Sequence, residues 1–215
     1  MAKKPKPKTY HHGDLREALI VAGAELIESN GLAGFTLRAC ARRAGVSHAA
    51  PRNHFASVEE LILVIAARGW EEFHTALAMA ANGAGAAPEA RLAAMGQAYV
   101  TFALQRLGIY SLMFRTGDFN AVRLASAGSS GLAALEAASS AGWRQLVEAV
   151  TAVTGPSPRV ELAALHVWSL VHGLASLSID RKLKDDGVRR QALDASLATL
   201  APTIRAIAQG VATAA

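Results

Sequence analysis

The chain has 215 residues, of which 52% are hydrophobic and 6% aromatic, and its formal net charge is +5. A chain of this length forms one large domain or a small and a medium one, and its apolar content provides a sizeable core. The single cysteine, Cys40, excludes an intramolecular disulfide, and we expect it to be a small packing residue. We find no apolar run of the length of a membrane span and no hydrophobic region of a signal peptide after the basic start. We therefore expect a cytoplasmic protein without a membrane partner.

The positive charge is concentrated at the N-terminal end. Residues 1–55 contain nine basic and four acidic side chains, so they carry the whole formal charge of +5, while residues 56–215 are balanced. Basic surfaces bind the phosphates of nucleic acids through counterion release, which gives affinity that does not depend on sequence. A nucleic-acid partner at this end is the simplest interpretation. The lysine- and proline-rich residues 1–9 are expected to be disordered when free, and either to follow the DNA or to stay solvated.

Apolar residues recur at helical spacing and no segment alternates convincingly, so we expect an all-α protein of about nine helices. The first predicted helix runs from about Gly13 to Asn30 and ends at Gly31, which acts as a C-terminal cap. Together with two short helices that follow, it forms a predicted N-terminal DNA-binding domain of residues 10–56.

Residues 35–55, FTLRACARRAGVSHAAPRNHF, are the most informative segment. Apolar residues spaced three and four apart predict a short helix, and Gly45 allows the left-handed backbone of a tight turn. Ser47 is expected to cap a second helix, with Pro51 in its first turn, where proline is tolerated. This is the pattern of a helix-turn-helix, whose second helix lies in the major groove of DNA.

Several side chains of this motif are suited to phosphates and base edges. Thr36 stands at a helix start, where free N–H groups and a side chain bind a phosphate. Arg38 is the preferred arginine for a backbone contact because it is near that helix start, and we expect Arg43 to be solvated. The candidate DNA-binding residues are Thr36, Arg38, Ser47, His48, Ala49, Arg52, Asn53 and His54.

Residues 57–215 are predicted to form a second, helical domain. Ser57 and Glu60 form a capping box, which opens a connecting helix over residues 57–82. The composition break ANGAGAAP at residues 81–88 ends this helix. Further helices are expected at about 88–107, 109–115, 132–154, 158–181 and 188–211, with a loop over 116–131 and a kink or division of the last helix at Pro202.

The two C-terminal helices indicate a homodimer. The helix over residues 158–181 is apolar almost all round, and the one over 188–211 carries a continuous apolar stripe. One subunit has too little surface to cover both, so we expect a symmetric four-helix interface made by these two helices from each subunit. Such a dimer places two recognition helices on the half-sites of a near-palindromic operator.

Aromatic and methionine side chains of the second domain occur together with a few polar groups, which is the usual composition of a ligand cavity. The same spacing is also typical of plain core, and both interpretations remain open for each residue. The candidate cavity residues are Met95, Tyr99, Phe102, Tyr110, Met113, Phe114, Trp143, Trp168 and His172.

Enzyme motifs are absent from the sequence. It contains no HExxH, no phosphate-binding glycine loop, no nucleophile elbow and no cysteine cluster, and its seven histidines lack a metal-ligand spacing. We therefore expect neither an enzyme nor a cofactor or metal site.

The order of one helix, a helix-turn-helix and a capped connecting helix resembles the N-terminal domain of the TetR (tetracycline-repressor) family. The matching residues are Gly31, Phe35, Thr36, Ala41, Ala44, Gly45, Val46, Ser47, His54, Phe55, Ser57, Glu60 and Leu61. Further on, Trp168, His172 and Gly173 resemble the Trp-His-Gly element in the C-terminal domain of one TetR subgroup.

The resemblance implies a homodimeric transcriptional regulator, usually a repressor, which a small apolar ligand in the C-terminal domain releases from double-stranded operator DNA. A transcriptional activator of the same fold and a helical dimer whose helix-turn-helix binds protein are the alternatives. The chain departs from the family pattern at Arg52, where an aromatic residue is usual, and at Val58, near a usual lysine. Arginine still reaches a phosphate or a guanine, whereas the phosphate contact near Val58 is expected to be lost.

Overall fold

The computed structural model describes residues 12–114, 129–182 and 185–210. The predictions for residues 1–9 and for most of the loop at 116–131 lie outside this part of the chain. The described elements are all helices, which confirms the expected all-α class. In chain order they are α1 (His12–Asn30), α2 (Leu37–Arg43), the 3-10 helix η1 (Ala50–Asn53), α3 (Val58–Gly83), α4 (Pro88–Gln105), α5 (Leu107–Phe114), α7 (Ser130–Thr154), α8 (Val160–Ile179), α9 (Asp186–Ala198) and α10 (Leu200–Gln209).

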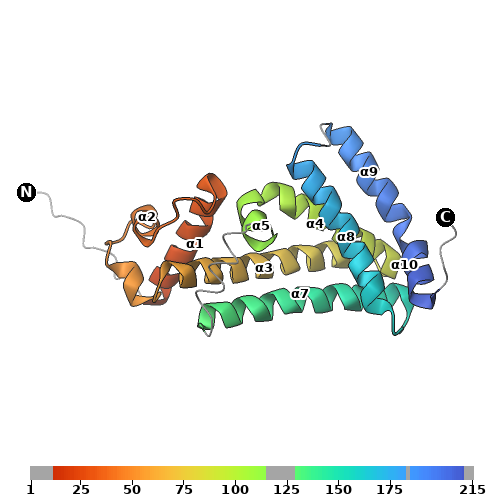
Figure 1. The fold of residues 1–215 in the computed structure, drawn as a ribbon, viewed down its shortest axis with the longest axis horizontal. Helices are drawn as coiled ribbons and strands as arrows, with labels where there is room; N and C mark the ends of the chain where they lie inside the picture. The colour runs from red at the N-terminus through yellow and green to blue at the C-terminus, as the bar shows by residue number, and fades with distance from the viewer. Residues whose placement is uncertain (1–11, 115–128, 183–184, 211–215) are drawn as a thin grey trace, which may run out of the picture.

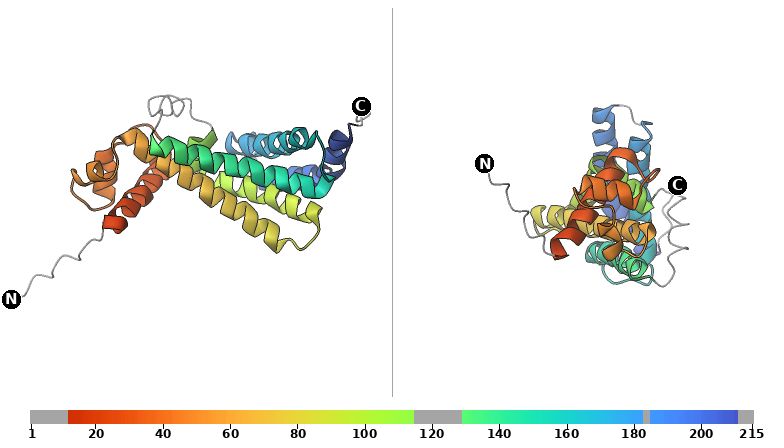
Figure 2. Two further views of the ribbon diagram at one scale, coloured as in Figure 1. Left: turned by 90° about the horizontal axis from the view of Figure 1, so that it is seen from below. Right: turned by 90° about the vertical axis from the view of Figure 1, so that its left-hand side faces the viewer.

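The helices form an elongated molecule with two ends. Figure 1 shows α1 and α2 at one end and α10 at the opposite end, with the long helix α3 leading from the first toward the second. Helix α7 lies beside α3 and runs in the same direction, as the left view of Figure 2 also shows. Helix α4 packs on α3, and α8 packs on α4, α7 and α10. Helix α3 is therefore shared by the helix-turn-helix end and the helical domain.

The start of α3 follows the predicted capping pattern. The Ser57 hydroxyl accepts a hydrogen bond from the Glu60 backbone N–H (3.2 Å), and the Glu60 carboxylate accepts one from the Ala56 N–H (2.7 Å). Two backbone donors at the helix start are thereby satisfied. The same carboxylate also accepts a hydrogen bond from Ser130, the first residue of α7, at 3.2 Å. This contact fixes the beginnings of α3 and α7 side by side.

The core of the helix-turn-helix end is small and apolar. Leu19, Ile27, Cys40 and Phe55 are buried there, with Arg16 above the Phe55 ring at 5.2 Å from its centroid. Burial raises the pKa of the Cys40 thiol to about 11, and its Sγ lies 3.5 Å from the carbonyl oxygen of Leu19. Since the thiolate is the reactive form, this cysteine is a packing residue.

The last predicted helix is divided in two, as expected from Pro202. The division lies at Thr199, between α9 and α10, and Pro202 stands in the first turn of α10, where its missing N–H cannot continue the helix from Ala198. The apolar stripe of Leu193, Leu197 and Ile204 is buried inside the subunit. These side chains are therefore not available to a partner, which corrects the expectation that the stripe forms part of the dimer interface.

Helix α8 lies within the expected range of 158–181 and is apolar along most of its length, as the sequence predicts. It is the one helix in the described ranges that could cross a membrane by length and composition alone. In the fold, however, it packs against α4, α7, α9 and α10, as a core helix of a helical domain does.

Candidate DNA-binding surface and ligand cavity

Helix α2 begins at Thr36, as the sequence predicts. The Thr36 backbone is extended, and its hydroxyl accepts a hydrogen bond from the Ala39 N–H at 3.1 Å. The turn after α2 contains Gly45 in the left-handed conformation, with φ of +70°, which glycine adopts without strain. The predicted helix and turn of this motif are therefore present.

The second helix of the motif differs from the prediction. It is the short 3-10 helix η1, its N-cap residue is Ala49, and Ser47 does not cap it. The cause is Pro51, which has no N–H to donate to the Ser47 carbonyl and disfavours α-helical backbone at the residue before it. The Ser47 carbonyl instead accepts from the Ala50 N–H (3.1 Å), and the Arg52 N–H bonds to Ala49 (3.2 Å), so the hydrogen bonds span three residues.

The candidate DNA-binding residues lie together at this end of the molecule. They occupy the start of α2, the turn and η1, and all of them are exposed except His54, which is half-buried. Two buried residues of the same segment, Pro51 and Phe55, hold η1 on the domain core. The polar side chains of the motif are therefore exposed to solvent, while Pro51 and Phe55 anchor its backbone to the core.

Arg43 is exposed, as expected, and it also makes a surface contact. Rather than being only solvated, its Nε lies 2.7 Å from Oε2 of Glu25 on α1, in an ion pair on the protein surface. This contact ties the end of α2 to α1. Arg43 is exposed, as Arg38 and Arg52 are, but its guanidinium is engaged in this contact.

A cavity of about 410 Å³ lies between the helices of the second domain. Its walls combine aromatic rings with smaller apolar side chains from α3, α4, α5, α7 and α8. The lining residues are Trp70, Phe73, Leu77, Leu92, Met95, Gly96, Tyr99, Met113, Phe114, Ser139, Gly142, Trp143, Gln145, Leu146, Val167, Trp168 and Val171. A cavity of this size and composition is typical of sites for small organic ligands.

The predicted cavity residues fall into two groups. Met95, Tyr99, Met113, Phe114, Trp143 and Trp168 line the cavity. Phe102, Tyr110 and His172 lie behind its wall instead. Phe102 packs on the ring of Phe73 (centroids 5.2 Å apart), while Tyr110 and His172 hydrogen-bond around Tyr99.

Tyr99 is the centre of a buried polar cluster. Its hydroxyl lies 2.8 Å from Nδ1 of His172, which also lies 3.0 Å from the Tyr110 hydroxyl. Nε1 of Trp168 donates to the Tyr99 hydroxyl at 3.4 Å. Burial, followed by the neighbouring Tyr110, raises the pKa of Tyr99 far above its ordinary value. The phenol therefore stays neutral, and its hydrogen bonds are made within the protein.

Sequence reasoning missed the contribution of α3 to the cavity. Trp70, Phe73 and Leu77 are spaced three and four apart, so they share one face of that helix, and all three line the cavity. The signal was present, but this helix had been interpreted only as a connection between the domains.

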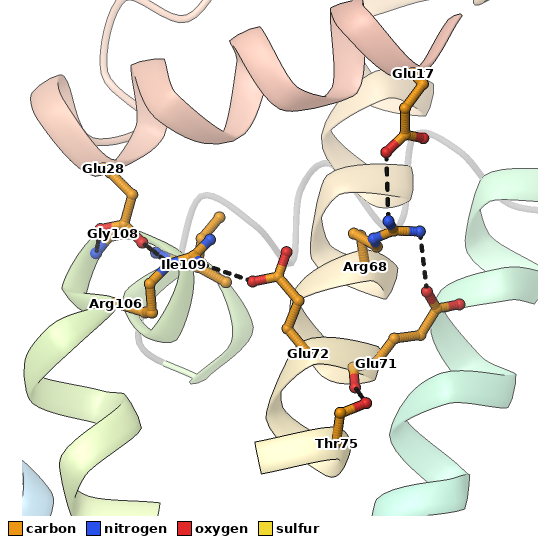
Figure 3. A network of polar contacts seen from close by, with 9 residues as sticks. All are labelled: Glu17, Glu28, Arg68, Glu71, Glu72, Thr75, Arg106, Gly108 and Ile109. Carbon is orange, nitrogen blue, oxygen red and sulfur yellow. Dashed lines mark hydrogen bonds and ion pairs between the residues drawn. The ribbon is translucent and has the colours of Figure 1, made fainter. Parts of the chain in front are cut away.

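Polar contacts join α1 to the second domain, as Figure 3 shows. The Glu28 carboxylate, in the last turn of α1, accepts hydrogen bonds from Arg106 Nε (3.0 Å) and the Gly108 N–H (2.8 Å). Nη1 of Arg106 also pairs with Glu72 of α3 at 2.7 Å. A second, more exposed pair joins Arg68 of α3 to Glu17 of α1 at 3.3 Å.

Family models match both parts of the chain. Residues 19–75 match bacterial regulatory proteins of the tetR family, and residues 92–203 match the tetracyclin repressor-like C-terminal domain. The second match alone covers more than half of the chain. The chain belongs to the TetR family.

Solved structures agree with this assignment. A protein of unknown function from Rhodococcus sp. RHA1 is 31% identical and has a TM-score of 0.73, over 94% of this chain and 100% of that chain. A TetR-family regulatory protein from Rhodococcus RHA1 is 19% identical (TM-score 0.61; 88% and 96% covered). Mycobacterium smegmatis BioQ is 21% identical (TM-score 0.56; 92% and 99% covered). These last two likenesses show the fold alone. No curated protein matches the chain.

TetR-family membership establishes a DNA-binding regulator of transcription, and such regulators are not enzymes. The chain's C-terminal match is to the tetracyclin repressor-like C-terminal domain. Membership of the Trp-His-Gly subgroup remains a prediction from Trp168, His172 and Gly173.

Proposed function

We propose that this TetR-family protein is a cytoplasmic, homodimeric repressor that binds a near-palindromic operator and leaves it when a small apolar ligand fills the cavity. In this proposal residues 10–56 form the DNA-binding domain and residues 57–215 the domain for ligand binding and dimerisation. The observation that carries it is the combination of an exposed polar and basic helix-turn-helix at one end with an aromatic cavity in the helical domain behind it.

The proposed operator contacts are made by residues 36–54. Thr36 and Arg38 stand at the start of α2, where unpaired N–H groups favour a phosphate. Ser47, His48 and Ala49 precede η1, and Arg52, Asn53 and His54 follow at its end, where side chains meet base edges or phosphates. The 3-10 form of η1 makes the recognition element short, which supports few base contacts and a large share of phosphate contacts.

The proposed dimer interface is centred on α8. One face of this helix is buried in the subunit, whereas Leu162, Leu165 and Leu177 are 55%, 46% and 45% exposed. Val188 at the start of α9 is also exposed. Apolar side chains of this size grouped on one helix favour contact with a second subunit. Helices α9 and α10 would contribute only their outer surfaces, because their stripe of leucine and isoleucine side chains is buried inside the subunit.

The proposed release by ligand is supported by the position of α5. Its C-terminal residues Met113 and Phe114 line the cavity, and its N-terminal Gly108 is bonded to Glu28 of α1. A ligand that binds one position of α5 better than another shifts the population of both ends of this helix. The change would reach α1 and alter the spacing of the two helix-turn-helix motifs in the dimer.

A mobility-shift titration with the DNA upstream of the protein's own gene tests this function. We expect sequence-selective binding that weakens steeply between two salt concentrations. A transcriptional reporter carrying the same DNA should show repression, and gel filtration should show a dimer. Absence of selective binding would contradict the operator proposal, and activation of the reporter would contradict the proposed sign of regulation.

A further inference from the structure

The walls of the cavity are rich in aromatic rings. Six rings line it, and they come from five helices: Trp70 and Phe73 from α3, Tyr99 from α4, Phe114 from α5, Trp143 from α7 and Trp168 from α8. All three tryptophans of the chain are among them. Aromatic residues make up 6% of the chain, and a large share of them line this cavity.

None of the ring pairs among these six residues is stacked: several meet edge to face, while Tyr99 and Phe114 are tilted at 38° and Phe114 and Trp168 at 51°. Trp143 and Trp168 have centroids 6.3 Å apart at 62°, and Trp70 and Phe114 are 4.9 Å apart at 66°. Phe73 and Tyr99 are nearly perpendicular, at 86°. Edge-to-face contacts of this kind leave ring faces and edges for a further ring, which prefers the same offset or edge geometry. A flat aromatic guest fits such walls better than a flexible chain.

The polarity of the cavity lining predicts whether the ligand is charged. Among the described residues that line the cavity none carries a charge, and the polar ones are Tyr99, Ser139 and Gln145 in addition to the indole nitrogens. Tyr99 is held neutral by burial and makes its hydrogen bonds to His172 and Trp168. An ionised group brought into this space would lose its hydration without gaining a partner, which is strongly unfavourable.

Helix α7 supplies the hydrogen-bonding groups that remain. Ser139 and Gln145 both lie on it and line the cavity. The Ser139 hydroxyl donates to the Glu136 carbonyl at 3.2 Å, so its oxygen is left as an acceptor. The Gln145 amide makes only a long contact with the His74 carbonyl, at 3.4 Å. A neutral donor or acceptor on the guest would therefore be oriented toward α7.

We propose that the effector of this cavity is an uncharged, flat aromatic molecule of about two or three rings that carries a neutral hydrogen-bonding group. The inference rests on the proposed ligand-binding function. It specifies the chemical class of the ligand, and it sets this site apart from one for a carboxylate on an aliphatic chain.

Three probes of nearly equal size test the class by calorimetric titration of the full chain. They are naphthalene-2-carboxamide, naphthalene-2-carboxylate and the saturated decahydronaphthalene-2-carboxamide. We expect the aromatic amide to bind at least about tenfold more tightly than either of the others, because one control adds a charge and the other replaces the flat aromatic rings with puckered saturated ones. Equal or tighter binding of the carboxylate or of the saturated amide overturns the proposal, as does failure of the aromatic amide to bind.

Two variants locate the binding. Ser139→Trp fills the cavity from its partly exposed side and should abolish binding of the aromatic amide, whereas Met79→Ala, at a residue of α3 that is 70% exposed and outside the cavity, should leave it unchanged. Unchanged binding by Ser139→Trp with an intact circular-dichroism spectrum overturns the assignment to this cavity. Operator release is measured in parallel. Selective amide binding without release contradicts the regulatory proposal alone, and release by the carboxylate instead contradicts the ligand class alone.

Discussion

Glu28 caps the helix that carries part of the cavity wall, because its carboxylate accepts a hydrogen bond from the Gly108 N–H at 2.8 Å. Glu28 belongs to α1, in the helix-turn-helix domain, and Gly108 to the first turn of α5. The same carboxylate accepts from the Ile109 N–H (3.3 Å) and from Arg106. A negative charge at a helix start accepts hydrogen bonds from the free N–H groups and interacts favourably with the positive end of the helix dipole. A residue of the helix-turn-helix domain therefore caps a helix of the second domain.

Replacing Glu28 by alanine should weaken this connection. The loss of a charged cap with three partners is expected to destabilise the protein by about 1–3 kcal/mol in denaturant unfolding. It should also reduce the effect of ligand on operator affinity more than it reduces operator affinity itself. The matched control is Glu17→Ala, which removes the half-exposed pair with Arg68 and should cost at most about 1 kcal/mol. Equal effects of the two variants would contradict a special role for Glu28.

Gly108 should tolerate no side chain. A Cβ at this position would lie 2.5 Å from the Ile27 carbonyl oxygen and 2.6 Å from Cα of Glu28, which are backbone atoms of α1 that have no room to rotate away. We expect Gly108→Ala to destabilise the protein by about 1–3 kcal/mol and to separate α5 from α1. Gly83→Ala, where no atom lies within 4 Å of the added Cβ, should be neutral or slightly stabilising. Thermal unfolding of both variants checks the difference, and a neutral Gly108→Ala would disprove the close contact.

Local chemistry predicted much of this molecule, and long-range contacts account for what it did not predict. Gly45 has the left-handed backbone that the turn requires, and Ser57 and Glu60 form the expected cap of α3. Ser47 fails as a cap because one proline changed the hydrogen-bond spacing around it. The cap of α5 was not predictable, since Glu28 and Gly108 are 80 residues apart and meet only in the folded chain. Which rings line the cavity and which lie behind it likewise depends on how five helices pack.

Arg52 is the departure from the family pattern that most affects the proposed operator contacts. Replacing this exposed residue of η1 by alanine should weaken operator binding without unfolding the protein. A phosphate contact predicts a uniform loss across DNA sequences and a salt slope reduced by about one, whereas a guanine contact predicts a loss of about 1–3 kcal/mol that is confined to the operator. Arg43→Ala, which removes the ion pair with Glu25, serves as the control. Unchanged affinity on both DNAs would show that Arg52 makes no contact.

Leu165 tests the proposed dimer interface. Replacing it by glutamate places a charge on the exposed face of α8, where contact with a second subunit would bury it without a partner. We expect the variant to sediment as a monomer at micromolar concentration and to bind the operator more weakly, because two half-sites are no longer engaged together. Met79→Glu introduces the same charge at another exposed apolar residue and should remain dimeric. A Leu165→Glu variant that stays dimeric would exclude this face of α8 as the interface.

His74 should make the stability of the protein depend on pH in the mildly acidic range. Its Nε2 is buried between α3 and α7 and has no hydrogen-bond partner in the described part of the chain, and burial lowers the pKa of His74 below its ordinary value of 6.5. The folded state therefore binds a proton less readily than the unfolded chain. The stabilisation is complete above pH 6.5, decreases as the pH falls below that value, and levels off once the pH is below the lowered pKa of the folded state.

We expect His74→Leu to lose this part of the pH dependence in denaturant unfolding between neutral and mildly acidic pH, while His48→Asn, at an exposed position, should keep it. A His74→Leu profile parallel to that of the unaltered protein would show that the buried imidazole does not govern the change, which would then have to come from other groups.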